Sequence, residues 1–112
     1  MHEVSLIESV VALVEEERRK QYFERVRVIR LRLGALGHAE PEALRFCFDA
    51  VTNGTVAAGA RLEIEMVPGE GWCESCCRTV PLEERFATCP VCGADVRMTA
   101  GDELRVAEME VE

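Results

Sequence analysis

The chain has 112 residues and a formal net charge of −8, with 21 acidic and 13 basic side chains. This length suits one compact unit with a small appended module, and a hydrophobic content of 48% is enough for a modest core. The acidic balance argues against a nucleic-acid partner, because such binding depends on phosphate neutralisation by Lys and Arg.

The cellular setting follows from two further observations. No apolar run approaches the ~18 residues that a membrane span needs, and no signal peptide is evident at the start of the sequence. The sequence also contains six cysteines, which in the absence of an export signal indicate a reducing compartment. We therefore expect a cytoplasmic protein that does not associate with a membrane.

The first predicted element is a helix over residues 3–20. Its apolar side chains recur at helical spacing, and basic residues at its end suit the helix dipole. The stripe consists of Val4, Ile7, Val11 and Val14, flanked by Leu6, Val10 and Leu13. We interpret this stripe as core.

A strand is predicted over residues 26–33, because apolar and basic residues alternate there. Ile29, Leu31 and Leu33 share one face, whereas Val26 and Val28 are out of phase with them. A change of phase near residues 28–29 is typical of a β-bulge.

A glycine-containing loop with His38 and Glu40 leads to a second predicted helix. Pro41 fits its first turn, with Glu40 near the N-cap, and Asn53-Gly54 fits its end. The predicted buried stripe is Leu44, Cys47, Phe48 and Val51.

Two more strands are predicted, over residues 61–67 and from residue 103 to the C-terminus. Their inward positions are Leu62, Ile64 and Met66 in the first and Leu104, Val106, Met109 and Val111 in the second. Arginines on the strand over residues 26–33 complement glutamates on these two strands, which favours pairing by a few tenths of a kcal/mol per pair.

The order of elements makes a geometric prediction. After the first helix, the chain returns as a strand. This strand, the second helix and the second strand form a right-handed βαβ unit with parallel strands. The N-terminus, the loop with His38 and Glu40, and the exit from residue 67 toward Cys73 should then lie at one end of the domain.

Two Cys-x-x-Cys pairs, Cys73/Cys76 and Cys89/Cys92, are separated by twelve residues. Each pair can hold a metal through a tight turn, and a hairpin can bring the pairs together into a tetrahedral zinc site. Four sulfurs leave no open position, so this zinc is expected to be structural. The alternatives are two disulfides or a rubredoxin-type iron site, for which Phe86 is the only aromatic residue between the pairs.

These elements predict an α+β fold, with a small mixed three-stranded sheet, two helices and an inserted zinc-ribbon module. The expected domains are 1–69 with 100–112, and 70–99 for the ribbon. Cys77 directly follows the first pair and can compete as a ligand, but the spacing favours Cys76. We expect a monomer or a weak homodimer, since the junction from Pro68 to Gly71 can let elements exchange between copies.

His2 offers a second metal site. The amine of Met1, the backbone nitrogen of His2 and its imidazole can form fused chelate rings, and nitrogen donors in a square plane suit Ni(II) or Cu(II). Glu3, Glu40 or His38 can complete the coordination shell.

Several segments together carry a family resemblance. They are Met1-His2-Glu3 before a helix, Leu33-Gly34-Ala35 before an acidic loop, Phe46-Cys47-Phe48, Gly59-Ala60-x-Leu62 and the two cysteine pairs. In this combination, over essentially the whole chain, the sequence resembles the HypA/HybF family of hydrogenase nickel-insertion proteins.

The resemblance implies a nickel metallochaperone with transient Ni(II) and structural Zn(II), and not an enzyme. It assigns nickel binding to His2, with Glu3 beside it, Met1 at the terminus and Glu40 in the acidic loop. It assigns zinc binding to Cys73, Cys76, Cys89 and Cys92. It further implies a first domain that binds nickel, and as partners a HypB-type GTPase, the hydrogenase large-subunit precursor and, in some bacteria, the urease system. The alternatives are a zinc-ribbon interaction module without nickel function and an iron electron-transfer protein.

Overall fold

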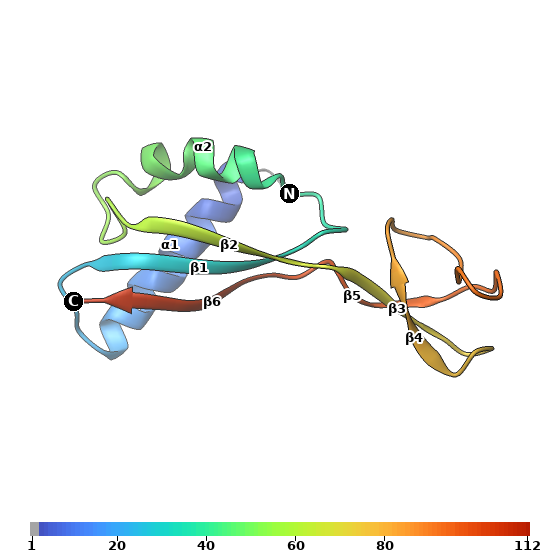
Figure 1. Ribbon diagram of the computed structural model, residues 1–112. Coiled ribbons are helices and arrows are strands. Elements are labelled where there is room, and N and C mark those ends of the chain that lie inside the picture. The colour runs from blue at the N-terminus through green and yellow to red at the C-terminus, as the bar shows by residue number, and fades with distance from the viewer. Residues whose placement is uncertain (1–2) are drawn as a thin grey trace. The chain divides into compact units, whose positions relative to one another are not determined.

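The computed structural model describes residues 3–112 (Figure 1). Its elements are α1 (Glu3–Lys20), β1 (Val26–Gly34), α2 (Pro41–Thr52), β2 (Arg61–Val67), β3 (Gly69–Cys73), β4 (Arg78–Leu82), β5 (Arg97–Ala100) and β6 (Leu104–Val111). Among these residues, no helix is long and apolar enough to cross a membrane.

The chain divides into two compact units. The first comprises the chain up to Leu31, Ala39–Glu65 and Val106–Glu112, and the second comprises Arg32–His38 and Met66–Arg105. The predicted domains, residues 1–69 with 100–112 and residues 70–99, have other boundaries than these units. As units of independent folding they stay a prediction.

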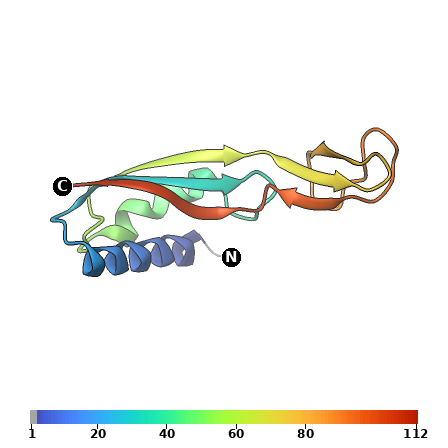
Figure 2. The same ribbon diagram turned by 90° about the horizontal axis from the view of Figure 1, so that it is seen from below.

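The first unit is built on a sheet with the strand order β2-β1-β6. β1 and β2 run in the same direction and β6 runs in the opposite one (Figure 1). Both helices lie on one face of this sheet (Figure 2) and pack against each other. The predicted mixed three-stranded sheet with two helices is therefore confirmed, and so is the α+β class.

Helix α1 has the predicted bounds, but its buried face differs slightly from the expected one. Its buried residues are Leu6, Ile7, Val10 and Val14. Leu13 is 48% exposed, so its interpretation as a core residue flanking the stripe was wrong. Leu6, at the equivalent place directly before Ile7, is buried, so the surroundings of each residue and not the helical period decide its exposure.

Helix α2 begins at Pro41 with Glu40 as the N-cap and ends at Thr52 with Asn53 as the C-cap, as predicted. Its fully buried residues are Leu44, Phe48 and Thr52. Cys47 and Val51 are only half-buried, because the stripe rotates toward Thr52 at a spacing of four residues. The hydroxyl of Thr52 donates to the carbonyl oxygen of Phe48 at 2.8 Å, which satisfies this buried polar group.

The central strand β1 shows the predicted change of phase. Val26 and Val28 are buried, Arg27 is exposed, and Ile29, Leu31 and Leu33 are then buried in alternation. The neighbouring β2 departs from expectation at its end, since Met66 is 45% exposed and Val67 is buried instead. The strict alternation of the strand breaks where the chain enters the second unit.

The predicted charge complementarity between the strands is confirmed. Arg30 on β1 pairs with Glu63 on β2 at 2.7 Å, and with Glu108 and Glu110 on β6 at 3.3 and 2.6 Å. The apolar positions expected in β6 are less buried than predicted, with Leu104 37% and Val111 42% exposed. An edge strand has a neighbour on only one side, which leaves its ends open to solvent.

The second unit contains an antiparallel sheet with the strand order β4-β3-β5. Most of the junction from Pro68 to Gly71 is strand, since β3 begins at Gly69 and its whole length pairs with β4; exchange of elements between copies stays a prediction. A Cβ atom at Gly69 would lie 2.5 Å from the carbonyl oxygen of Leu82. Glycine here permits a close backbone approach rather than mobility.

Candidate metal centre

The second unit brings together the four paired cysteines. The ligand atoms of Cys73, Cys76, Cys89 and Cys92 all lie within 4.8 Å of one another. The sulfur separations are 3.6 Å for Cys73–Cys92 and 4.0 Å for Cys76–Cys89. A tetrahedral zinc with Zn–S bonds of ~2.3 Å requires sulfurs about 3.8 Å apart. These residues therefore fit a four-coordinate zinc ion.

Two tight turns hold the sulfurs. In the first turn, at the end of β3, the N–H of Cys76 points to Sγ of Cys73 at 3.4 Å. In the second turn, the N–H of Val91 points to Sγ of Cys89 at 3.4 Å, and the N–H of Gly93 donates to the carbonyl oxygen of Cys89 at 2.8 Å. Backbone N–H groups aimed at sulfur favour thiolates, the form that binds metal.

The electrostatics of the four thiols are uneven. Backbone N–H groups of Cys92 and Val91 lower the pKa of Cys89 below its usual value. The sulfur of Cys92, burial and the other two sulfurs raise the pKa of Cys76, because thiolates close together repel one another. A divalent cation among the four sulfurs would offset that repulsion.

Burial supports a structural centre. Cys73 and Cys89 are buried and form a core cluster with Val80, against which Cys76, Ala94 and Val96 pack. All six cysteines are free thiols, and the sulfur separations above exceed the ~2.05 Å of a disulfide bond. Phe86 is 97% exposed and does not shield the sulfurs.

Cys77 lies outside the four-sulfur cluster. Its side chain is exposed and its Sγ contacts the carbonyl oxygen of Glu74 at 3.3 Å. Its φ of 52° is left-handed, like the 75° of Gly93. Cys77 and Gly93 each follow the second cysteine of a pair, so Cys77 occupies the place that glycine takes in the other turn.

The residues predicted to bind nickel are only partly described. Met1 and His2 lie outside the described residues. In the first unit, the backbone N–H of Glu40 approaches Oε2 of Glu3 at 3.4 Å, which places the start of α1 beside the N-cap of α2. His38 is an exposed residue of the second unit. The predicted convergence of all these residues with the zinc segment stays a prediction.

One contact of the loop before His38 has no signal in the sequence. Nε of Arg85 donates to the carbonyl oxygen of Leu36 at 2.8 Å, and the same guanidinium lies 3.8 Å from the carboxylate of Asp102. Arg85 and Leu36 are 49 positions apart. No spacing rule relates residues at that separation, so only the tertiary structure identifies the pair.

The fold and the four-sulfur centre define a small α+β metal-binding protein with a zinc-ribbon-type centre. The chain belongs to the HypA family, whose sequence model is described as hydrogenase/urease nickel incorporation, metallochaperone, and matches residues 1–111. The family is thus one of nickel metallochaperones for hydrogenase or urease, and relatives of this chain are named hydrogenase maturation factors.

Individual relatives agree with the family. The chain is 83% identical to the hydrogenase maturation factor HypA of Methylocella silvestris, over the full length of both. It is 54% identical to that of Rhizobium leguminosarum bv. viciae, over 99% of each. The solution structure of the Ni metallochaperone HypA from Helicobacter pylori shares the fold, with a TM-score of 0.74 at 24% identity, covering 99% of this chain and 97% of that one.

Proposed function

We propose that this chain binds Ni(II) at its N-terminus and delivers it during maturation of [NiFe]-hydrogenase, while a structural Zn(II) holds the second unit. The observation that carries the proposal is the match to the nickel-incorporation family over residues 1–111. The zinc assignment rests on the four-sulfur geometry, since Cys73, Cys76, Cys89 and Cys92 would complete a tetrahedral shell without an open position.

The nickel assignment rests on donor chemistry. His2 would supply an imidazole and a backbone nitrogen, and Met1 the terminal amine, a set suited to square-planar Ni(II). The approach of Glu3 to the backbone of Glu40 supports carboxylate oxygens from both residues beside this terminus. His38 is the remaining imidazole of the sequence and the second candidate for the shell.

Delivery follows from the weakness of such a site. A shell made largely from a chain terminus can open toward ligands of a partner, whereas four thiolates in two fixed turns exchange slowly. The amine and the imidazole must lose their protons to bind the metal. The affinity for nickel should therefore fall as the pH falls from 7.5 toward ~6, near the ordinary pKa of histidine at ~6.5.

The partners expected on this proposal are a HypB-type GTPase and the hydrogenase large-subunit precursor. The family description also mentions urease, so the urease system is the second candidate recipient of the nickel. The relatives named above are hydrogenase maturation factors, which favours hydrogenase as the main target. The six free thiols suit work in a reducing cytoplasm.

Metal content and a Ni(II) titration on untagged protein test the proposal. We expect one zinc per chain in the native protein and in His2→Ala, with nickel affinity reduced by about tenfold or more in His2→Ala, since one donor is lost. Mass spectrometry of the native N-terminus verifies that the amine is free. The matched control is His38→Ala, which removes the other imidazole and should change nickel affinity less than His2→Ala does.

Two results would overturn the proposal. Zinc without nickel in the native protein would leave a zinc-ribbon interaction module, and equal nickel affinity in native protein and His2→Ala would remove the N-terminal site. A nickel affinity that stays flat between pH 7.5 and ~6 would contradict release by protonation of nitrogen ligands.

A further inference from the structure

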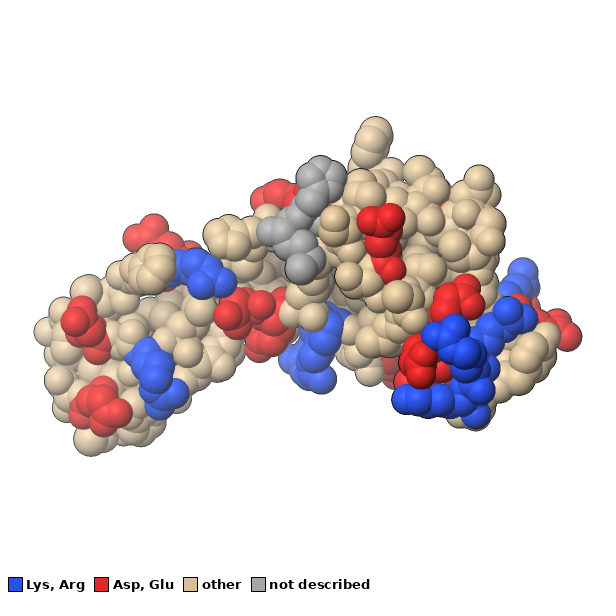
Figure 3. All heavy atoms as spheres, turned by 180° about the vertical axis from the view of Figure 1, so that it is seen from behind, with Lys and Arg blue, Asp and Glu red and all other residues tan. Residues whose placement is uncertain are grey.

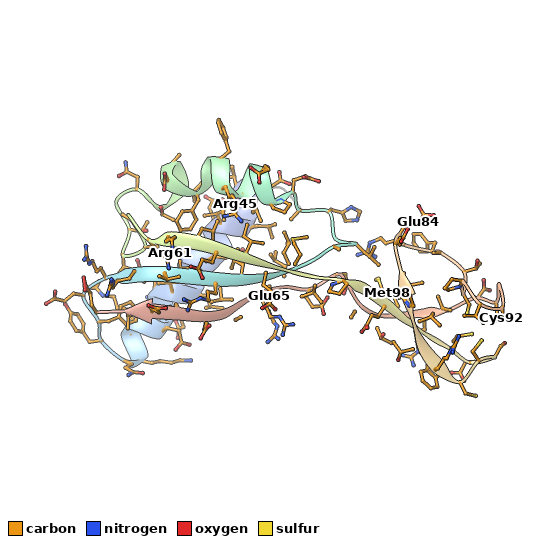
Figure 4. All side chains as sticks on the ribbon, in the orientation of Figure 1. Arg45, Arg61, Glu65, Glu84, Cys92 and Met98 are labelled. Atoms are coloured by element: carbon orange, nitrogen blue, oxygen red, sulfur yellow. The ribbon has the colours of Figure 1, made fainter. Side chains whose placement is uncertain are left out.

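The second unit carries an open groove beside the end of β4. Its volume is about 620 Å³, and its lining combines apolar and acidic side chains. The lining residues are Pro81, Leu82, Glu83, Glu84, Ala87, Thr88 and Pro90. Glu84 lies well away from Cys92 (Figure 4), whereas Thr88 and Pro90 of the lining flank the ligand Cys89 in the sequence.

The groove has an unbalanced negative charge. Among the described residues, the carboxylates of Glu83 and Glu84 have no ion-pair or hydrogen-bond partner, and both are exposed. Arg85 follows them directly, but its guanidinium is engaged by the carbonyl oxygen of Leu36 and by Asp102. The guanidinium of Arg85 therefore pairs with groups other than Glu83 and Glu84. At the end of α1, by contrast, basic side chains pair with neighbouring acidic ones (Figure 3).

Phe86 is not among the lining residues, but it directly precedes the lining residue Ala87 in the sequence and exposes an apolar ring. Its side chain is 97% exposed, and its φ of 63° lies in the left-handed region, which is unfavourable for a residue with a Cβ atom. Gly, the usual residue for such a φ, would relieve the backbone and remove the exposed ring. Val91, which directly follows the lining residue Pro90 in the sequence, is 60% exposed. An exposed aromatic ring on a strained backbone, within the segment that lines the groove, is typical of an interaction surface.

We propose that this groove and Phe86 form a docking surface for a basic, apolar segment of a partner protein. Lysine or arginine side chains of the segment would pair with Glu83 and Glu84, and its apolar side chains would cover Phe86 and the groove floor. Charge complementarity determines this choice of occupant, because an acidic segment or an anionic membrane would meet two unpaired carboxylates.

Recognition of the segment should depend on side chains rather than on strand addition. β4 is an edge strand of the second sheet, where a segment could otherwise pair with backbone groups. It contains Pro81, a residue type without an N–H that disfavours pairing at sheet edges. The surface therefore accepts a segment laid into the groove next to β4.

The probe is a short synthetic peptide of alternating lysine and leucine, added to zinc-loaded, ¹⁵N-labelled protein. We expect its amide shift changes to cluster on residues 81–90. Phe86→Ser should weaken the peptide by about fivefold or more, since apolar area is lost, and Glu84→Gln by about twofold or more, since a charge pair is lost. Added salt should weaken binding as it screens the charges.

The chain offers a matched control for each change. Phe46→Ser removes a phenylalanine of α2 that is 91% exposed, and Glu74→Gln removes one exposed carboxylate of the same unit. Neither change should alter the peptide affinity. Each variant is used only after its zinc content and its amide spectrum match the native protein, and Glu84→Gln keeps the test decisive if Phe86→Ser does not fold.

Four outcomes would overturn the proposal. Three are shift changes outside residues 81–90, equal binding of a peptide with glutamate in place of lysine, and equal weakening by the matched controls. The fourth is self-association in sedimentation velocity that Phe86→Ser abolishes, which would assign the surface to a second copy. None of these measurements involves nickel, so failure of the docking surface and failure of the proposed nickel delivery are distinguishable.

Discussion

The core of the first unit and the surroundings of the metal centre in the second unit bury different kinds of side chain. In the first unit, aliphatic residues of two helices pack on a sheet, with Ile7, Ile29 and Leu44 all fully buried. Around the metal centre of the second unit, the buried cluster is Val80 with two cysteines, Cys73 and Cys89. We therefore expect apolar burial to stabilise the first unit by itself, and we expect the metal centre of the second unit to need its four thiolates neutralised.

The largest expected effect comes from removing one zinc ligand. Cys73→Ser should abolish stoichiometric zinc binding, because serine supplies no thiolate and only three ligands remain. The second unit should then lose its fold, because structural zinc contributes about 10–16 kcal/mol of apparent binding free energy to small zinc modules. The amide signals of β3, β4 and β5 should lose their dispersion, while the circular dichroism of α1 and α2 persists. The measurement combines zinc content, an amide spectrum and far-ultraviolet circular dichroism.

The control for this prediction is Cys77→Ser, which alters the thiol directly after the first pair but outside the four-sulfur cluster. It should retain one zinc and native spectra. If Cys73→Ser unfolded the helices together with the metal centre, or kept its zinc, the contrast between the two units would be wrong.

A core truncation in the first unit should have the opposite pattern. Leu44 is fully buried, and Leu44→Ala should lower the free energy of unfolding by about 2–5 kcal/mol. Urea unfolding followed by circular dichroism measures this loss, and zinc content should not change. The neighbouring Phe46, which is 91% exposed, provides the control, since Phe46→Ala should change stability by no more than about 0.5 kcal/mol. Zinc loss in Leu44→Ala would contradict separate sources of stability.

Much of the first unit could be predicted from local pattern. Helix α1 and the bounds of α2 follow from apolar periodicity, Pro41 and Asn53. The charge pairs of Arg30 follow from opposite charges on the three strands. Exposure was harder to predict, because Leu13 and Met66 are apolar residues whose exposure depends on neighbours distant in the sequence.

The candidate site divides in the same way. The spacing of four cysteines predicts their convergence, because each pair closes within one turn. Strands β3 and β5 could not be predicted from alternation, since they are short and β3 contains two glycines whose role depends on close tertiary contacts. The contact of Arg85 with Leu36 and the groove beside Phe86 likewise depend on long-range packing.

A smaller effect tests how the first zinc turn is built. Cys77 has a left-handed φ of 52°, and that conformation costs about 1–2 kcal/mol for a residue with a Cβ atom. Cys77→Gly should therefore stabilise the second unit by a net ~0.5–1 kcal/mol, after the greater entropy of unfolded glycine is subtracted. Zinc affinity in a chelator competition should rise about two- to fivefold.

The control is Cys77→Ala, which removes the thiol but keeps the Cβ atom and should not raise the zinc affinity. An equal rise in both variants would trace the effect to competition by the Cys77 thiol instead of backbone strain. The reverse change, Gly93→Ala, places a Cβ atom at a φ of 75° and should lower the affinity.

The smallest effect concerns the charge pairs of Arg30 on the sheet of the first unit. Hydrogen bonding to Arg30 holds the pKa of Glu63 below its usual value of 4.5. A depressed carboxyl pKa stabilises the fold at pH above the unfolded value, and this stability is lost as the pH falls through the folded value. Carbon-13 titration of the Glu63 carboxyl should show its pKa rising in Arg30→Gln.

The control is Arg25→Gln, which removes a cation that pairs with Glu112 instead and should leave the Glu63 titration unchanged. A shift in both variants would mean that the general charge of the sheet, and not the contact with Arg30, sets this pKa.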